Sequence, residues 1–243
     1  MKYSILLSLL CCSLNLFSQT CIILNKTEGV IYVGSDSRGG AFKSVPGNSP
    51  SILCKINSVG KFNFAISGVG FPMALEECKK ACPNKTTFLE VINIFVPSFI
   101  KKLQDSLEIV RQRLPALFTE ITHSPEHLAN VLFFGTEADS LYIAQVRFVL
   151  DTDISTPVRV SASGGPYATK TNKPIIIATG FTDEIEPIVF KEKTWQAGIV
   201  KTIKRLIQIE IKYHPDKVNG PIDILKVTLK GNEWIQRKNV CLN

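Results

Sequence analysis

The cysteine and histidine residues are the first candidates for chemistry in this sequence, because both residue types bind metals. Cys78 and Cys82 lie four positions apart in a segment of helical character, and His123 and His127 have the same spacing around Pro125. Neither pair has a third ligand nearby, whereas a zinc site needs at least three protein ligands. We therefore expect no metal and no cofactor, and we interpret the two cysteines as thiols on one helix face.

The start of the chain predicts a secretory signal peptide over residues 1–19. One positive charge precedes the apolar run Ile5–Phe17, and a small polar exit follows. The run has 13 residues, which is short for a membrane span and favours export over anchoring. The mature chain would then begin at Gln19, Thr20 or Cys21 and would be secreted or periplasmic.

Removal of this signal leaves five cysteines, which are Cys21, Cys54, Cys78, Cys82 and Cys241. Cysteines of an exported protein can form disulfides. The count is odd, so at least one thiol stays free or pairs with another chain.

The composition excludes several classes of protein. The 243 residues are 45% hydrophobic and 20% charged, which argues against a disordered or fibrous chain. The 28 Lys and Arg residues exceed the 21 Asp and Glu residues and leave a net charge of +7. No basic run is longer than two residues, so we interpret the charge as a solvated surface. We expect no nucleic-acid partner and no membrane contact after signal removal.

The apolar periodicity predicts an α+β chain. The expected strands are 20–24, 30–35, 51–56, 61–67, 130–136, 141–149, 158–162, 222–229 and 233–236, and the expected helices are 71–81, 87–114 and 195–213. Pro97 should bend or interrupt the second helix. Strands in hairpins and helices in pairs favour antiparallel sheets stacked face to face with the helices outside.

One spaced motif begins at Thr20. Asp36 follows after sixteen residues without a gap, and Ser37 and Arg38 come next. This arrangement resembles the start of a proteasome β-subunit or of its simpler bacterial ring-protease relative, in which the mature chain opens with threonine. The resemblance therefore favours a cut directly before Thr20.

Four further segments resemble that family in the same order. They are the strand end Phe64–Gly68, the hairpin Asn130–Val146, the glycine-rich segment Ser161–Ala168 and the turn His214–Gly220. The resemblance runs from Thr20 to about Ile235. It implies a single domain, residues 20–243, with the four-layer α/β/β/α sandwich of an N-terminal nucleophile (Ntn) hydrolase that cleaves peptide or other amide bonds.

The resemblance also implies a role for each matched residue. The Thr20 hydroxyl would attack the substrate, and its own α-amine would accept the proton. The Gly68 N–H would bind the oxyanion, and Asp36 would orient a cation. Ser163 and Asp216 would hold the amino terminus. The remaining matches are Arg38 in the Asp-x-Arg motif and Asn219, which stands where serine is usual.

The family's active-site lysine has no counterpart at the expected place. Ile52 stands 32 residues after Thr20, and Lys55 would face the other way if 51–56 is a strand. Lys43 would reach the site only by an unusual path, which leaves Arg38 as a partner for Asp36. Without this preorganised charge, we expect any hydrolysis to be slow.

A second departure lies between residues 169 and 191. Their composition breaks the helix that the family has there and predicts a strand or loop excursion. In the family that helix contacts a neighbouring ring, so ring assembly does not carry over to this chain. Whether the chain forms a homo-oligomer is left open.

Three functions remain open at this stage. The first is an exported threonine-type hydrolase, with Cys21 as a second possible nucleophile. The second is a catalytically silent proteasome-like subunit with a structural or binding role, which Ile52 favours. The third is a generic secreted binding domain, in which Thr20 is only the first residue of a buried strand.

Overall fold

The computed structural model describes residues 20–39, 52–122, 128–151, 157–167 and 174–241. The predicted signal peptide, Lys43 and the pair His123 and His127 lie outside these residues. The fold is α+β, with two sheets whose strands are all antiparallel to their neighbours. No helix in the described ranges combines the length and the apolar character that a membrane crossing requires.

The first sheet carries both ends of the described chain. Its order is β10-β9-β2-β1-β8, with β1 Cys21–Thr27, β2 Val30–Ser35, β8 Ile175–Gly180, β9 Asp223–Thr228 and β10 Gly231–Gln236. The predicted excursion after residue 169 is confirmed, because β8 lies there and pairs with β1 at the edge of the sheet.

The second sheet has the order β3-β4-β5-β6-β7. Its strands are β3 Ile56–Val59, β4 Phe62–Gly68, β5 Ala129–Glu137, β6 Ser140–Leu150 and β7 Val160–Pro166. The prediction of a strand over 51–56 is wrong. The strand begins at Ile56 and ends at a turn containing Gly60, whose φ of 59° suits glycine.

The helices are α2 Phe71–Ala81, α3 Phe88–Arg113, α4 Pro115–Thr122, α5 Glu186–Val189 and α6 Ile199–Tyr213, with short 3-10 turns η1 Glu192–Trp195 and η2 Asn239–Cys241. Three of the helices follow the predicted apolar periods, although the helix expected over 195–213 begins at Ile199, and α4 and α5 were not predicted. Thr87 and Glu90 form a reciprocal capping box at the start of α3. Pro97 lies inside α3 and does not interrupt it.

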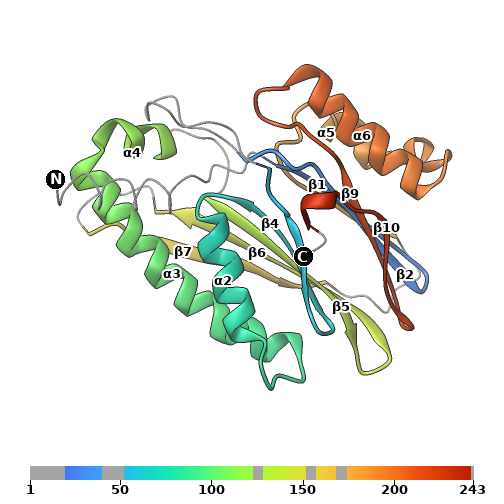
Figure 1. Cartoon of the computed structure of the whole chain (residues 1–243), viewed down its shortest axis with the longest axis horizontal. Helices are drawn as coiled ribbons and strands as arrows, with labels where there is room; N and C mark the ends of the chain where they lie inside the picture. Colours follow the sequence, from blue (N-terminus) through green and yellow to red (C-terminus); the bar gives the residue numbers. More distant parts are fainter. Residues whose placement is uncertain (1–19, 40–51, 123–127, 152–156, 168–173, 242–243) are drawn as a thin grey trace.

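Three apolar clusters hold these elements together. One lies between the second sheet and α2, α3 and α4, with Phe95 and Phe99 near its centre. Another joins the two sheets, and the third packs α5 and α6 on the first sheet. In Figure 1, α2 and α3 lie beside the second sheet, and α6 lies beyond the first sheet on the opposite side.

The side chains of β1 alternate between two of these clusters. Ile22 and Leu24 belong to the cluster between the sheets, whereas Cys21 and Ile23 belong to the cluster under α6.

Candidate active site

Thr20 lies directly before β1 and is fully buried. Its carbonyl oxygen accepts a hydrogen bond of 2.7 Å from the Phe181 N–H, which extends the pairing of β1 with β8. Gly180 makes this close approach possible, since a Cβ there would lie 1.7 Å from the Thr20 carbonyl oxygen. Gly180 also has a φ of 82°, so both sterics and backbone conformation require glycine.

Asp36 is the residue to which the other groups of the candidate site are hydrogen-bonded. Its fully buried carboxylate follows the end of β2 and accepts four hydrogen bonds. The Cys21 N–H (3.1 Å) and the Lys55 Nζ (2.9 Å) both contact Oδ1. The N–H groups of Arg38 (3.0 Å) and Asn219 (3.2 Å) contact Oδ2. These donors offset the cost of burying a carboxylate.

Lys55 is the charged partner of Asp36, so the prediction that its side chain faces away is wrong. Residues 53–55 precede β3 and are not part of a strand, so the strand alternation does not apply to them. Lys55 is fully buried, and burial lowers the pKa of its ammonium to about 8, although Asp36 opposes that shift. At neutral pH such an ammonium is mostly charged, but neutral pH lies close to the range in which it titrates.

Neither position 52 nor the Arg38 guanidinium supplies this charge in the described part of the chain. Ile52 forms an isolated bridge with Arg38, and its side chain is 57% exposed. Arg38 contacts Asp36 through its backbone N–H, not through its guanidinium. The buried positive charge beside Asp36 comes from Lys55, three residues after Ile52.

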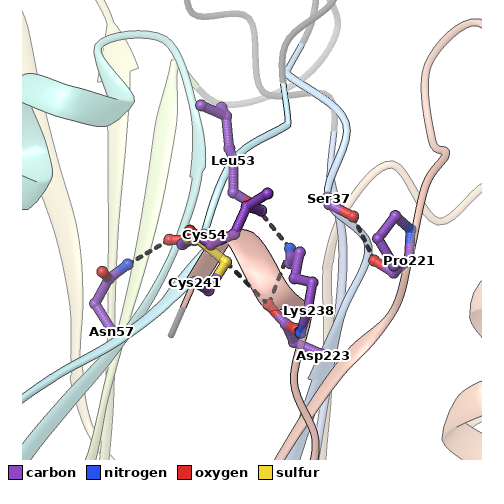
Figure 2. The surroundings of a disulfide bond; sticks show 9 residues. Ser37, Leu53, Cys54, Asn57, Pro221, Asp223, Lys238 and Cys241 are labelled. Atoms are coloured by element: carbon purple, nitrogen blue, oxygen red, sulfur yellow. Dashed lines mark hydrogen bonds and ion pairs between the residues drawn. A yellow bond between two sulfur atoms is a disulfide. The ribbon is translucent and has the colours of Figure 1, made fainter. Parts of the chain in front are cut away.

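The segment that carries Lys55 is held on both sides. The Leu53 N–H donates to the Ser37 carbonyl oxygen at 2.7 Å, and the Ile66 N–H donates to the Lys55 carbonyl oxygen at 3.1 Å. From the other side, Lys238 Nζ donates to the Leu53 carbonyl oxygen at 2.7 Å. Figure 2 shows this lysine between Leu53 and Asp223, beside the disulfide that ties residue 54 to the end of the chain.

The cysteines divide into one disulfide and three thiols among the described residues. Cys54 and Cys241 are bonded with an S–S distance of 2.08 Å, whereas Cys21, Cys78 and Cys82 are free and buried. No group of three potential metal ligands occurs in the part of the chain that the structure describes.

Cys21 is a poor candidate for the nucleophile. Its side chain packs among apolar residues under α6. Burial and the nearby Asp36 carboxylate raise the pKa of its thiol well above the usual value. The thiolate needed for attack is thus disfavoured.

Gly68 is the last residue of β4. Its φ of 98° and the 2.3 Å that would separate a Cβ from the Leu128 carbonyl oxygen both require glycine. The neighbouring Ser67 was not singled out from the sequence. Its hydroxyl is buried without a hydrogen-bond partner among the described residues, and its Cβ lies 3.6 Å from the Cβ position of Gly180.

Ser163 lies in β7 and is exposed. A single register row joins Ser67, Asn130, Arg147 and Ser163 across β4, β5, β6 and β7. Ser163 also lines a pocket of about 410 Å³ together with Arg147 and Tyr167. The structure places Ser163 on the same sheet as Gly68 but gives it none of the contacts that join Asp36 to Lys55.

The turn after α6 contributes Asn219 but not Asp216 to the Asp36 cluster. Besides its N–H bond to Asp36, Asn219 accepts a 3.1 Å bond from the Ser37 N–H at its carbonyl oxygen. Asp216 is exposed and forms no ion pair with any residue of the described ranges.

Comparisons with known proteins give distant similarities to solved structures. No protein-family model and no curated protein matches this chain. The chain is similar to the solved structure of Anbu (ancestral beta-subunit) from Yersinia bercovieri, at 13% identity over 90% of this chain and 88% of that chain, with a TM-score of 0.45. It is also similar to an Anbu mutant from Hyphomicrobium sp. strain MC1, at 13% identity over 90% and 88% of the two chains, with a TM-score of 0.48. At this identity, neither similarity identifies a nucleophile or a substrate.

Proposed function

We propose that this chain is an exported Ntn hydrolase that cleaves peptide or other amide bonds, with Thr20 as its nucleophile once residues 1–19 are removed. The observation that carries the proposal is the cluster on Asp36. One carboxylate oxygen accepts from both the Cys21 N–H and the Lys55 ammonium. A buried positive charge therefore lies beside the peptide that joins Thr20 to Cys21.

The reaction follows from the groups on the Thr20 residue itself. The hydroxyl oxygen attacks the amide carbonyl carbon, and the free α-amine accepts the hydroxyl proton, directly or through water. The proton passes to the leaving amine as the C–N bond breaks, and an ester to Thr20 remains. Water then attacks this ester, which releases the acid and restores the hydroxyl.

Lys55 has two tasks in this reaction. Its charge disfavours a second positive charge nearby, so it keeps the Thr20 α-amine neutral and able to accept a proton. It also stabilises the alkoxide that develops on the Thr20 oxygen. Because the ammonium is buried, water screens neither effect strongly.

The remaining matched residues have supporting roles in this proposal. Gly68 would present its N–H to the oxyanion, and Ser163 and Asp216 would hold the amino terminus. Asn219 positions the Asp36 carboxylate through its N–H. The helices and sheets would form the four layers α/β/β/α, an order supported by the three separate apolar clusters.

The missing lysine was the observation that favoured a catalytically silent subunit. The Lys55–Asp36 pair removes that observation, so we favour the hydrolase over the alternative of a silent subunit. The same pair supports a hydrolase of ordinary rate instead of the slow one expected from Ile52.

The test is to secrete the full chain, determine the first residue of the mature protein by Edman sequencing, and treat it with a peptidyl epoxyketone. This electrophile bonds to both the hydroxyl and the amine of an N-terminal threonine. We expect one label on Thr20 and loss of amidase activity with it. A matched chain that keeps Gln19 should not label. Wild-type protein with a free Thr20 that never labels, or activity that survives Thr20→Ala, would overturn the proposal.

A further inference from the structure

We propose that Lys238 and the Cys54–Cys241 disulfide are positioning groups for Lys55, and that reduction of this disulfide by a dithiol slows the reaction at Thr20. The inference rests on the proposed function and extends it to the end of the chain. Lys238 does not touch Asp36 in the hydrogen-bond network, so it acts through the segment that carries Lys55.

The first argument is the conformation of residues 52–55. An active-site lysine on a strand would be fixed by the ladder of its sheet, but Lys55 precedes β3. Its direction toward Asp36 depends on the contacts of the two residues before it. Leu53 is held by Ser37 on one side and by Lys238 on the other, and Cys54 is held by a covalent bond.

The second argument is that Lys238 is itself held by buried contacts. The side chain of Lys238 is 2% exposed, and its ammonium pairs with Asp223 at 2.9 Å. The Lys238 N–H also donates to Asp223 Oδ1 at 2.8 Å. Asp223 is the first residue of β9, an inner strand of the first sheet. A chain of buried contacts thus runs from β9 through Asp223 and Lys238 to the Leu53 carbonyl oxygen.

The third argument is electrostatic. The charged and titratable groups that act on Lys55 are Asp36, Lys238 and Cys21. Lys238 is the positive one, and its charge lowers the pKa of the Lys55 ammonium. Removal of that charge should therefore raise the pKa of Lys55 and move its titration to higher pH.

The disulfide adds a second tie at the neighbouring residue. It joins positions separated by 187 residues and fixes η2 against the segment. A dithiol such as dithiothreitol can open it by thiol–disulfide exchange. Two electrons and two protons pass to Cys54 and Cys241, and the reagent becomes a cyclic disulfide. Residues 52–55 then keep only their hydrogen bonds.

The experiment compares Lys238→Met with Lys226→Met in the secreted protein. Lys226 is a matched control, since it also pairs with a carboxylate, Glu233, at 2.8 Å, but no hydrogen bond or ion pair joins its ammonium to the described residues 52–55. We expect Lys238→Met to lower kcat about tenfold to a hundredfold with little change in KM, because small misplacements of catalytic groups have effects of this size. Lys238→Arg should restore part of kcat, and Lys226→Met should change neither constant.

A second readout does not depend on activity. In the Thr20→Ala chain, the ¹³Cε signal of Lys55 should titrate at higher pH after Lys238→Met than before it. If wild-type protein shows no Thr20-dependent activity, the proposed function fails, but this titration still tests whether Lys238 acts on Lys55. An unchanged Lys55 titration would overturn the inference.

Reduction of the wild-type protein covers the case in which Lys238→Met does not fold. We expect dithiothreitol to lower kcat severalfold and reoxidation to restore it, while circular dichroism shows that the fold remains. The double variant Cys54→Ser with Cys241→Ser should have the lower kcat from the start and should not respond to the reagent. Full activity in the reduced protein, or an equal response of the double variant, would contradict the role of the disulfide.

Discussion

The candidate site has a buried side and an exposed side, and the two sides differ in how its residues are held. Thr20, Asp36 and Lys55 are completely buried, and every donor and acceptor described on Asp36 is paired. Ser163 and Asp216 are exposed at the surface. Water competes for hydrogen bonds and screens charges on the exposed side but not on the buried side. Preorganised electrostatics should therefore come almost entirely from the buried side.

The largest expected effect is that of Thr20→Ala. Removal of the nucleophile should lower kcat/KM by about 10⁴-fold or more. The fold should persist, because the backbone pairing of Thr20 with Phe181 does not use the side chain. Initial rates and a thermal unfolding curve of the same preparation would measure both. Activity close to that of wild type would place the nucleophile elsewhere.

The next effect is that of Lys55→Met. Loss of the ammonium should lower kcat about 10² to 10³-fold. It should also destabilise the protein by about 3 to 5 kcal/mol, because it leaves the Asp36 carboxylate buried without a counter-charge. Urea unfolding and steady-state rates would give the two numbers separately.

The double variant Lys55→Met with Asp36→Asn separates stability from catalysis. Because both charges are then absent, most of the lost stability should return, while activity should stay low. Recovery of activity together with stability would show that Lys55 has only a structural role.

The dependence of rate on pH tests the charge on the buried side of the site. Lys55 must be charged in the proposed reaction, and burial lowers the pKa of its ammonium to about 8. The rate should therefore fall as pH rises through about 8 in a profile of kcat against pH. Lys55→Arg should remove this alkaline limb if the guanidinium fits, since arginine does not titrate in this range.

The smallest effects belong to the exposed side. Ser163→Ala and Asp216→Asn should each change stability by less than about 0.5 kcal/mol, as surface substitutions usually do, and should change kcat only a few-fold. Ile52→Lys should not raise activity, because this side chain is already 57% exposed and Lys55 supplies the buried charge. A loss of several hundredfold in Ser163→Ala would break the distinction between the two sides.

Much of the local structure could be predicted from the sequence. The period of apolar residues located α2 at its actual bounds and the hairpin of β1 and β2 within three residues. Thr20 and Asp36 were singled out because their gapless spacing resembles the start of a proteasome β-subunit. Such signals depend on neighbours in the sequence, whose periodic burial leaves a pattern that can be read without the fold.

The charged group that pairs with Asp36 followed from the fold and not from the sequence pattern. The strand expected over residues 51–56 begins at Ile56 instead, and a shift of this kind changes where each side chain points. β-branched composition does not set the first residue of a short strand. The ladder with β4 and the contacts of Leu53 with Ser37 and Lys238 set it here.

The pairing of Cys54 with Cys241 and of Lys238 with Asp223 likewise came only from the fold. The cysteines lie 187 residues apart, and five cysteines permit many pairings that spacing alone does not distinguish. Sequence therefore determined the residues that can do chemistry and the elements near them. The packing of the two sheets decided which of these residues meet, because contacts between distant segments depend on the closed, solvent-free core and leave no local periodic trace.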